Sequence, residues 1–277
     1  MKQFKEINPS PRTLMTPGPV EADPRVLRAM SAHILGQFDP EFTALMNETM
    51  EMARYVFQTE NRQTYVVDTT SRGGLETVLT GAICPGDKVL IPAFGRFGYL
   101  LAEILERCGA DITLLEKEWG TVFEPEEIED ALKKNNYKAV ACIHGETSTS
   151  MMQPLKEIGE ICERYGVLLL VDAVATLGGT EVNVDEWKLS ACISGTQKCI
   201  YAPSGSALIT YNQQIEDIVK KRKRVEKGIR NAEDVDGKLP GIPSNYLDLG
   251  QLEDYWSPRR LNHHTEATSM QYAVHEA

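Results

Sequence analysis

The 277-residue sequence has no apolar run long enough to cross a membrane, and residues 1–13 lack the apolar region of a signal peptide. Its six cysteines form no Cys-x-x-Cys pair, and cysteine and histidine never cluster at the spacing of zinc ligands. These absences argue against a membrane protein, a disulfide scaffold and a zinc site. We therefore expect a protein of the reducing cytoplasm that has free thiols and no metal.

An excess of basic residues is also missing, because the formal net charge is −11. This charge argues against nucleic acid and anionic membranes as main partners. One basic cluster, residues 220–230, departs from the trend and is predicted to be the solvated face of a helix. His263 and His264 are adjacent, so on a regular element their side chains would point in different directions.

Internal repeats, low-complexity segments and the patterns GxGxxG and GxxxxGK[ST] are absent, so neither a dinucleotide fold nor a P-loop is indicated. Apolar runs alternate instead with helical patterns. The runs lie at residues 64–68, 88–93, 112–116, 138–145, 167–175, 189–198 and 206–212, and the helical patterns at 75–83, 94–109, 124–135 and 154–166. This alternation predicts an α/β fold, an open parallel sheet with helices on both faces.

Ligands of such sheets bind beyond the carboxyl ends of the strands, so the residues that follow each strand are candidates for a site. Thr70, Ser71 and Arg72 open a helix after the first strand, where a phosphate could bind, although threonine and serine are also ordinary helix caps. Asp172 follows five apolar residues, and a carboxylate there requires a cationic partner, which could be purely structural. Lys198 ends a small polar loop after an apolar run, although most lysines are merely solvated.

These features together indicate one ligand. A helix N-terminus for a phosphate, an aromatic such as Phe97 for stacking, an acid for a pyridinium and an amine for an aldehyde are the requirements of pyridoxal 5′-phosphate. The acid keeps the ring nitrogen protonated, and the lysine must lose its own proton before it can react.

The motifs GTQK, VDAVATLGG, HGETST and HHT resemble those of class V, fold-type I aminotransferases of the alanine–glyoxylate and serine–pyruvate group. The resemblance implies a mostly parallel seven-stranded sheet and a homodimer whose active sites lie between the subunits. It implies that Lys198 binds the cofactor and moves the proton, and that Asp172 pairs with the pyridine nitrogen. The remaining cofactor contacts implied by it are Ser71, Arg72, Phe97, Ser148, Val174 and Gln197, with Thr265 from the other subunit.

The segments GQFDPEF (36–42), TSRGGLE (70–76) and RRLNHHTEAT (259–268) are similar to those of (S)-ureidoglycine–glyoxylate aminotransferases of purine and allantoin breakdown. In this interpretation the carboxamides of Gln37 and Asn262 recognise the planar ureido group, and the partners are an amino donor and a 2-oxo acid. Alternatively, both side chains merely satisfy backbone groups. An alanine– or serine–glyoxylate/pyruvate aminotransferase and a cofactor-binding or dimerisation module without turnover also remain open.

Three regions are expected along the chain. Residues 1–20 form an N-terminal arm, residues 21–262 form the large cofactor-binding domain, and residues 263–277 begin the helix that leads to a C-terminal small domain. The resemblance places the arginine that binds the substrate carboxylate in that small domain. Because the sequence ends within a helical pattern, we expect a fragment that builds the cofactor site but not the whole substrate site.

Overall fold

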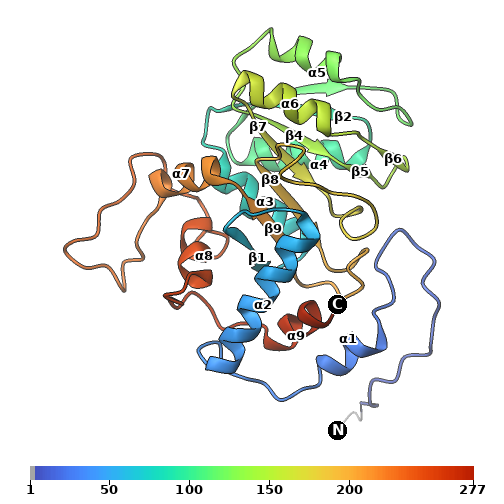
Figure 1. Ribbon diagram of the computed structural model, residues 1–277, viewed down its shortest axis with the longest axis vertical. Helices are drawn as coiled ribbons and strands as arrows, with labels where there is room; N and C mark the ends of the chain where they lie inside the picture. Colours follow the sequence, from blue (N-terminus) through green and yellow to red (C-terminus); the bar gives the residue numbers. More distant parts are fainter. Residues whose placement is uncertain (1–3) are drawn as a thin grey trace.

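A seven-stranded sheet organises the computed structural model, which describes residues 4–277 (Figure 1). The spatial order of the strands is β1-β9-β8-β7-β4-β2-β3, in which β9 is antiparallel to both neighbours and all other pairs are parallel. The strands are β1 (Gln63–Val67), β2 (Lys88–Ala93), β3 (Asp111–Glu116), β4 (Ala139–Ile143), β7 (Leu168–Asp172), β8 (Ala191–Gly195) and β9 (Ala207–Tyr211). The short strands β5 (Gly145–Glu146) and β6 (Met151–Met152) form a separate antiparallel pair. The predicted mostly parallel α/β sheet is confirmed.

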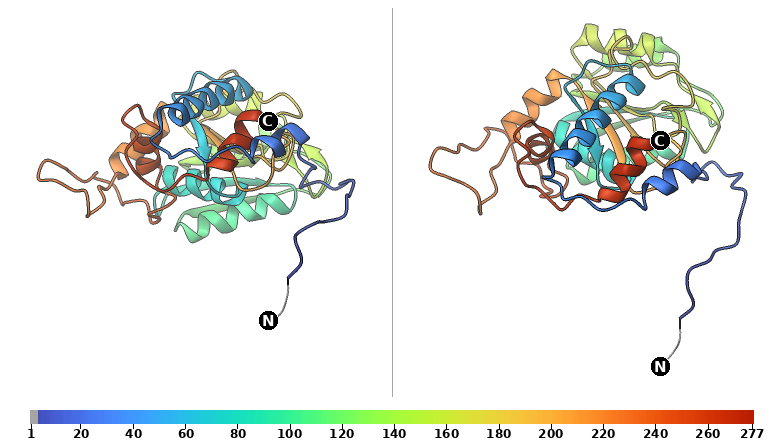
Figure 2. Two further views of the ribbon diagram at one scale, coloured as in Figure 1. Left: turned by 90° about the horizontal axis from the view of Figure 1, so that it is seen from below. Right: turned by 60° about the horizontal axis from the view of Figure 1, so that its bottom comes forward.

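Helices cover both faces of this sheet, which explains why its central strands are continuous apolar runs rather than alternating ones. The helices are α1 (Pro24–Ala29), α2 (Pro40–Phe57), α3 (Ser71–Ala82), α4 (Arg96–Arg107), α5 (Pro125–Leu132), α6 (Lys156–Tyr165), α7 (Gln213–Arg222), α8 (Leu249–Trp256) and α9 (Thr268–Glu276). In Figure 2 (left), α2 and α4 lie on opposite sides of the sheet. No helix among residues 4–277 combines the length and the hydropathy that a membrane crossing requires.

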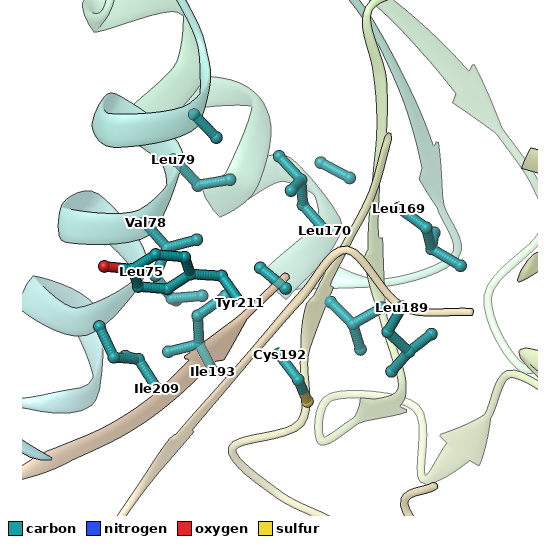
Figure 3. Packing of buried hydrophobic residues seen from close by; sticks show 14 of the residues in the cluster. Leu75, Val78, Leu79, Leu169, Leu170, Leu189, Cys192, Ile193, Ile209 and Tyr211 are labelled. Atoms are coloured by element: carbon teal, nitrogen blue, oxygen red, sulfur yellow. The ribbon is translucent and has the colours of Figure 1, made fainter. Parts of the chain in front are cut away.

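The packing of α3 on the sheet shows how sequence periodicity becomes a core. Leu75, Val78 and Leu79 recur at the spacing of one helix face and point at the sheet beside Ile193 and Ile209 (Figure 3). All five side chains are buried, and burial of each contributes about 1.5–3 kcal/mol relative to exposure. This packing fixes α3 so that its first turn lies at the carboxyl ends of the strands.

The basic segment 220–230 departs in part from the prediction. Helix α7 ends at Arg222, and the following residues form a loop that extends away from the body (Figure 1). Arg222 is only 1% exposed, and its guanidinium donates to the carbonyls of Gly81 (3.1 Å) and Ile83 (2.7 Å) at the end of α3. The prediction of a solvated helix face is confirmed for Lys220 and Lys221, which are exposed on α7. It is wrong for Arg222, because the last carbonyls of α3 need donors that the helix itself does not supply, and for the residues after Arg222, which form a loop.

The two ends of the described chain differ in their packing. Residues 4–22 contain no helix or strand and run as an extended arm, visible in both views of Figure 2. Helix α9 instead packs against α1 and α2, and its Ala273 is buried with Val26 of α1. The boundaries at residues 20 and 262 stay a prediction.

Candidate active site

A cavity of about 380 Å³ opens at the carboxyl ends of the parallel strands. Its walls come from the segments that follow β1, β4, β7 and β8, together with the first turns of α3 and α4 and part of the N-terminal arm. The structure brings eight predicted residues to this cavity, namely Thr70, Ser71, Arg72, Phe97, Asp172, Val174, Gln197 and Lys198. These residues span more than a hundred positions of sequence, and the parallel sheet alone brings them together.

Lys198 stands on a hydrogen-bonded loop that begins where β8 ends. The hydroxyl of Thr196 donates to the Pro203 carbonyl at 2.5 Å and is within 3.2 Å of the Ser206 carbonyl, which ties the start of the loop to its end. Gly195 permits close approach of α3, because a Cβ there would lie 1.8 Å from the Ser71 hydroxyl. The loop therefore holds the Lys198 amine in a defined place at the cavity wall.

The N-terminal arm closes over this lysine. The Lys198 amine donates to the Pro17 carbonyl, and the Val20 amide donates to the Gln197 carbonyl at 3.1 Å. Gly18 lies against the amine in the left-handed region, with φ of +138°, and a Cβ there would come within 2.6 Å of Nζ. Sequence reasoning gave no role to Gly18 or Pro19, although both line the cavity, because the arm reaches Lys198 from about 180 residues away along the chain.

Asp172 ends β7 beneath the cavity. Asp172 is 6% exposed, and one of its carboxylate oxygens accepts a hydrogen bond from the Val174 amide at 2.8 Å. Burial raises the pKa of Asp172 to about 6, while the hydrogen bond from Val174 and the charge of Lys198 oppose that rise. The site thus contains a buried carboxylate that would gain stability from a cationic group placed in the cavity.

The first turn of α3 offers donors to an anion. Thr70 is its N-cap but makes no side-chain capping bond, and the first turn contains no acidic residue. Arg72 is exposed and lines the cavity, while the Gln197 amide lies 2.6 Å from the Ser71 hydroxyl. Backbone N–H groups, a guanidinium and a hydroxyl form the kind of cradle that binds phosphate.

Of the aromatic residues that follow β2, only Phe97 reaches the cavity. Phe94 is buried against Phe123, and the Tyr99 hydroxyl donates to Glu116 at 2.5 Å. The loop after β4 contributes Thr147 rather than Ser148 to the cavity wall.

Ser148 turns towards α4. Its hydroxyl donates to Glu146 at 2.6 Å and accepts from the Arg96 amide at 2.9 Å. Its role as a cofactor contact therefore stays a prediction without support from its placement, and Thr147 is the neighbour that sequence reasoning passed over.

Gln37, Asn262 and Thr265 lie outside the cavity that this chain encloses. Asn262 and Thr265 are exposed, and the Gln37 amide donates to the His264 carbonyl at 3.3 Å, so Gln37 contacts the segment that contains the other two. This contact agrees with the alternative in which Gln37 satisfies a backbone group, and it also gathers the predicted substrate-recognising residues in one place. Thr265 is expected to reach the site of a second subunit, and the roles of all three residues stay predictions.

His263 and His264 do not point apart, as a regular element would require. Their Nδ1 atoms lie 2.8 Å from each other, because the segment between α8 and α9 is irregular. His264 also approaches Asp68 (3.4 Å) and Glu266 (3.8 Å). Burial and the neighbouring Asp68 carboxyl raise the pKa of Glu266. Sequence reasoning missed this cluster, because Asp68 lies almost 200 residues before its other members.

Comparisons with known proteins agree with this geometry. The model of the family "Aminotransferase class-V" matches residues 25–234. The (S)-ureidoglycine–glyoxylate transaminase of Bacillus subtilis is 61% identical over 268 residues, which cover 96% of this chain and 64% of that protein. The alanine–glyoxylate aminotransferase of Drosophila melanogaster is 33% identical, again over 96% of this chain and 64% of the relative.

Two solved structures have the same fold. The crystal structure of ureidoglycine–glyoxylate aminotransferase from Bacillus subtilis has a TM-score of 0.91 at 58% identity, and the match covers 98% of this chain and 66% of the Bacillus chain. The crystal structure of alanine–glyoxylate aminotransferase from Nostoc sp. has a TM-score of 0.91 at 36% identity, and the match covers 99% of this chain and 69% of the Nostoc chain. This chain thus spans just under two thirds of the curated relatives named here. The resemblance read from the sequence is confirmed, and the chain belongs to the class-V aminotransferase family.

Proposed function

We propose that this chain is the cofactor-binding part of a pyridoxal-phosphate-dependent enzyme that transfers the amino group of (S)-ureidoglycine to glyoxylate. The observation that carries the proposal is the 61% identity over 96% of the chain with the Bacillus subtilis transaminase of that name. The alanine–glyoxylate relatives are 32–35% identical over a similar share of the chain. A difference of that size favours the ureidoglycine substrate.

The residues of the cavity fit pyridoxal phosphate. The Lys198 amine is free to bind an aldehyde once it leaves the Pro17 carbonyl, and the buried Asp172 carboxylate suits a protonated ring nitrogen. The uncapped first turn of α3 with Arg72 suits the phosphate, and Phe97 offers a face for the ring. Each of these groups lines one cavity of about 380 Å³.

When bound, the cofactor supplies an electron sink for the pair released as the substrate Cα loses its proton. The chain's own residues do the remaining work. Lys198, whose loop is fixed by Thr196, would accept and hold the proton beside the substrate Cα, and the Asp172 carboxylate would keep the ring nitrogen protonated. The glycine at position 18 leaves space for the Lys198 side chain at the cavity wall.

We further propose a cytoplasmic homodimer with shared sites, in which Thr265, Gln37 and Asn262 reach the partner's cavity. Asn262 and Thr265 are exposed and Gln37 is half-buried. The contact of Gln37 with the His264 carbonyl brings it to the segment that contains the other two, which supports that assignment. The six free cysteines, all within residues 84–199, support a reducing compartment.

Alanine– or serine–glyoxylate/pyruvate transamination is the second candidate, favoured by the 36% identity and TM-score of 0.91 with the Nostoc structure. An asparagine at position 262 and a glutamine at position 37 offer hydrogen bonds that an alanine side chain cannot use. A chain that binds the cofactor without turnover is the third candidate, because two thirds of the relatives' length need not suffice for catalysis.

The test loads the protein with pyridoxal phosphate and follows the absorbance of the bound cofactor after freshly generated ureidoglycine, alanine or serine is added. The proposal expects a spectral change with ureidoglycine and a much slower one with the other two. Lys198→Ala should abolish the covalently bound chromophore, while Lys134→Ala, which removes an exposed lysine, should retain it. A change with alanine alone would put the second candidate first, and a chromophore that no donor alters would favour the third.

A further inference from the structure

Helix α4 receives its N-terminal cap from outside the helix. Its own N-cap is Gly95, which makes no side-chain capping bond, and its first turn contains no acidic residue. The first amides of a helix need acceptors. Here the Phe97 amide donates to a Glu146 carboxylate oxygen at 2.9 Å, and the Arg96 amide donates to the Ser148 hydroxyl at 2.9 Å. The loop after β4 therefore caps the helix that contains Phe97.

The surroundings of Glu146 hold its carboxylate in this capping position. It is 1% exposed, and among the described residues it forms no salt bridge, although a buried carboxylate usually requires a cation. Its second oxygen accepts from the amide (2.9 Å) and the hydroxyl (2.6 Å) of Ser148. Three N–H or O–H donors and the positive end of the helix dipole replace the cation.

Space for this carboxylate exists because residue 95 is glycine. A Cβ at Gly95 would lie 2.3 Å from Cγ of Glu146 and 2.7 Å from the Ser148 hydroxyl. The backbone of Gly95 is extended, with φ of 176°, so close packing and not backbone strain requires a glycine here. Removal of the carboxylate and addition of a methyl group at position 95 therefore disturb the same contact from opposite sides.

The contact matters to the site because of where Phe97 lies. Its amide is held by Glu146, and its side chain lines the cavity that also contains Asp172 and Val174. The Glu146 charge also acts on Asp172, whose pKa it raises together with burial. We propose that Glu146 is a positioning residue that acts through Phe97: it fixes the start of α4 so that the aromatic ring forms a preset wall for the cofactor. This inference rests on the proposed function, because it presumes that the cavity binds pyridoxal phosphate.

The experiment measures pyridoxal phosphate affinity by absorbance titration, and the induced circular dichroism of the bound cofactor, in single and double variants. Glu146→Gln retains one acceptor oxygen and should weaken binding about tenfold, and Glu146→Ala should weaken it further. Gly95→Ala should reproduce the loss. Phe97→Ala alone should cost roughly tenfold, and adding Glu146→Gln to it should cost less than a further twofold, since residues that act as one unit are not additive. The induced circular dichroism of Glu146→Gln should approach that of Phe97→Ala.

Asn212→Ala is the matched control, because the Asn212 side chain caps another helix, α7, and does not line the cavity. It should alter affinity by less than threefold while the unfolding midpoint falls as in Glu146→Gln. A Glu146→Gln protein that is less stable but binds the cofactor with unchanged affinity and circular dichroism would overturn the positioning role. If Glu146→Gln weakened cofactor binding by the same factor in the wild type and in Phe97→Ala, the route through Phe97 would be overturned. A wild-type chain that binds no cofactor would overturn the proposed function and this inference with it.

Discussion

Substitution of Arg222 tests how helix α3 is held in place. The buried guanidinium of Arg222 connects the end of α3 to the loop that follows α7. It donates to the carbonyls of Gly81 and Ile83 at the end of α3, and to that of Pro240 at 2.9 Å in the loop that follows α7. The opposite end of α3 carries Ser71 at the cavity. Replacement of Arg222 by methionine removes every one of these donors but retains much of the side-chain volume.

The expected cost follows from the groups left behind. The bonds to Gly81 and Ile83 are fully buried, and an unsatisfied buried carbonyl costs about 1–3 kcal/mol, so Arg222→Met should lower the free energy of unfolding by about 4 kcal/mol. Lys221→Met is the matched control, because it alters an exposed cation on the same helix and should change stability by less than about 0.5 kcal/mol. Since native domains have only about 5–15 kcal/mol in total, the difference is large.

The assay is urea unfolding followed by tryptophan fluorescence, in which the buried Trp256 reports on the neighbouring α8. If Arg222→Met does not fold, Arg222→Lys serves instead, because a single ammonium cannot reach all the carbonyls and should cause about half the loss. A loss below about 1 kcal/mol for Arg222→Met, relative to Lys221→Met, would refute the argument that this arginine closes the end of α3.

Three further predictions concern the cavity and the charge of the core. Gly18→Ala should slow covalent loading of pyridoxal phosphate at Lys198, measured by absorbance, since a φ of +138° strains alanine and its Cβ would lie 2.6 Å from Nζ, whereas Gly36→Ala, which has open space around it, should load normally. Asp172→Asn should slow the half-reaction about a hundredfold or more in stopped-flow absorbance, because a carboxamide cannot keep the ring nitrogen charged; an unchanged rate would remove Asp172 from the mechanism. Burial raises the pKa of Glu253 from 4.5 to about 7, so its folded form holds a proton that the unfolded chain releases, and stability should fall by about 3 kcal/mol as the pH rises from about 4.5 to about 7. Glu253→Gln should flatten that part of the pH profile in chemical denaturation, and a profile as steep as that of the wild type would contradict this origin.

The sheet and the strand-end residues were predictable because each rests on a local signal. Apolar runs such as residues 88–93 became a strand with those same bounds, and the rule that ligands bind beyond strand ends brought Asp172 and Lys198 to one cavity. Asp172 ends β7 and Lys198 lies three residues after β8, so the parallel sheet places both at the same edge.

The misses arise where long-range contacts override local pattern. Arg222 looked like a solvated helix charge, but the distant end of α3 required its donors. Ser148 stands in the right loop, yet the uncapped start of α4 draws its hydroxyl away from the cavity. Gly18 could not be assigned, since its contact with Lys198 depends on how the N-terminal arm folds back. None of these contacts leaves a periodic signal in the sequence.

The ureidoglycine half-reaction tests the central claim most directly. The chain is loaded with pyridoxal phosphate, ureidoglycine is added without glyoxylate, and absorbance follows the bound cofactor while mass spectrometry identifies its form. The account predicts conversion to the amino form of the cofactor with ureidoglycine at a rate far above that with alanine, and no chromophore in Lys198→Ala. Equal or faster conversion with alanine, or a chromophore that survives the loss of Lys198, would contradict it.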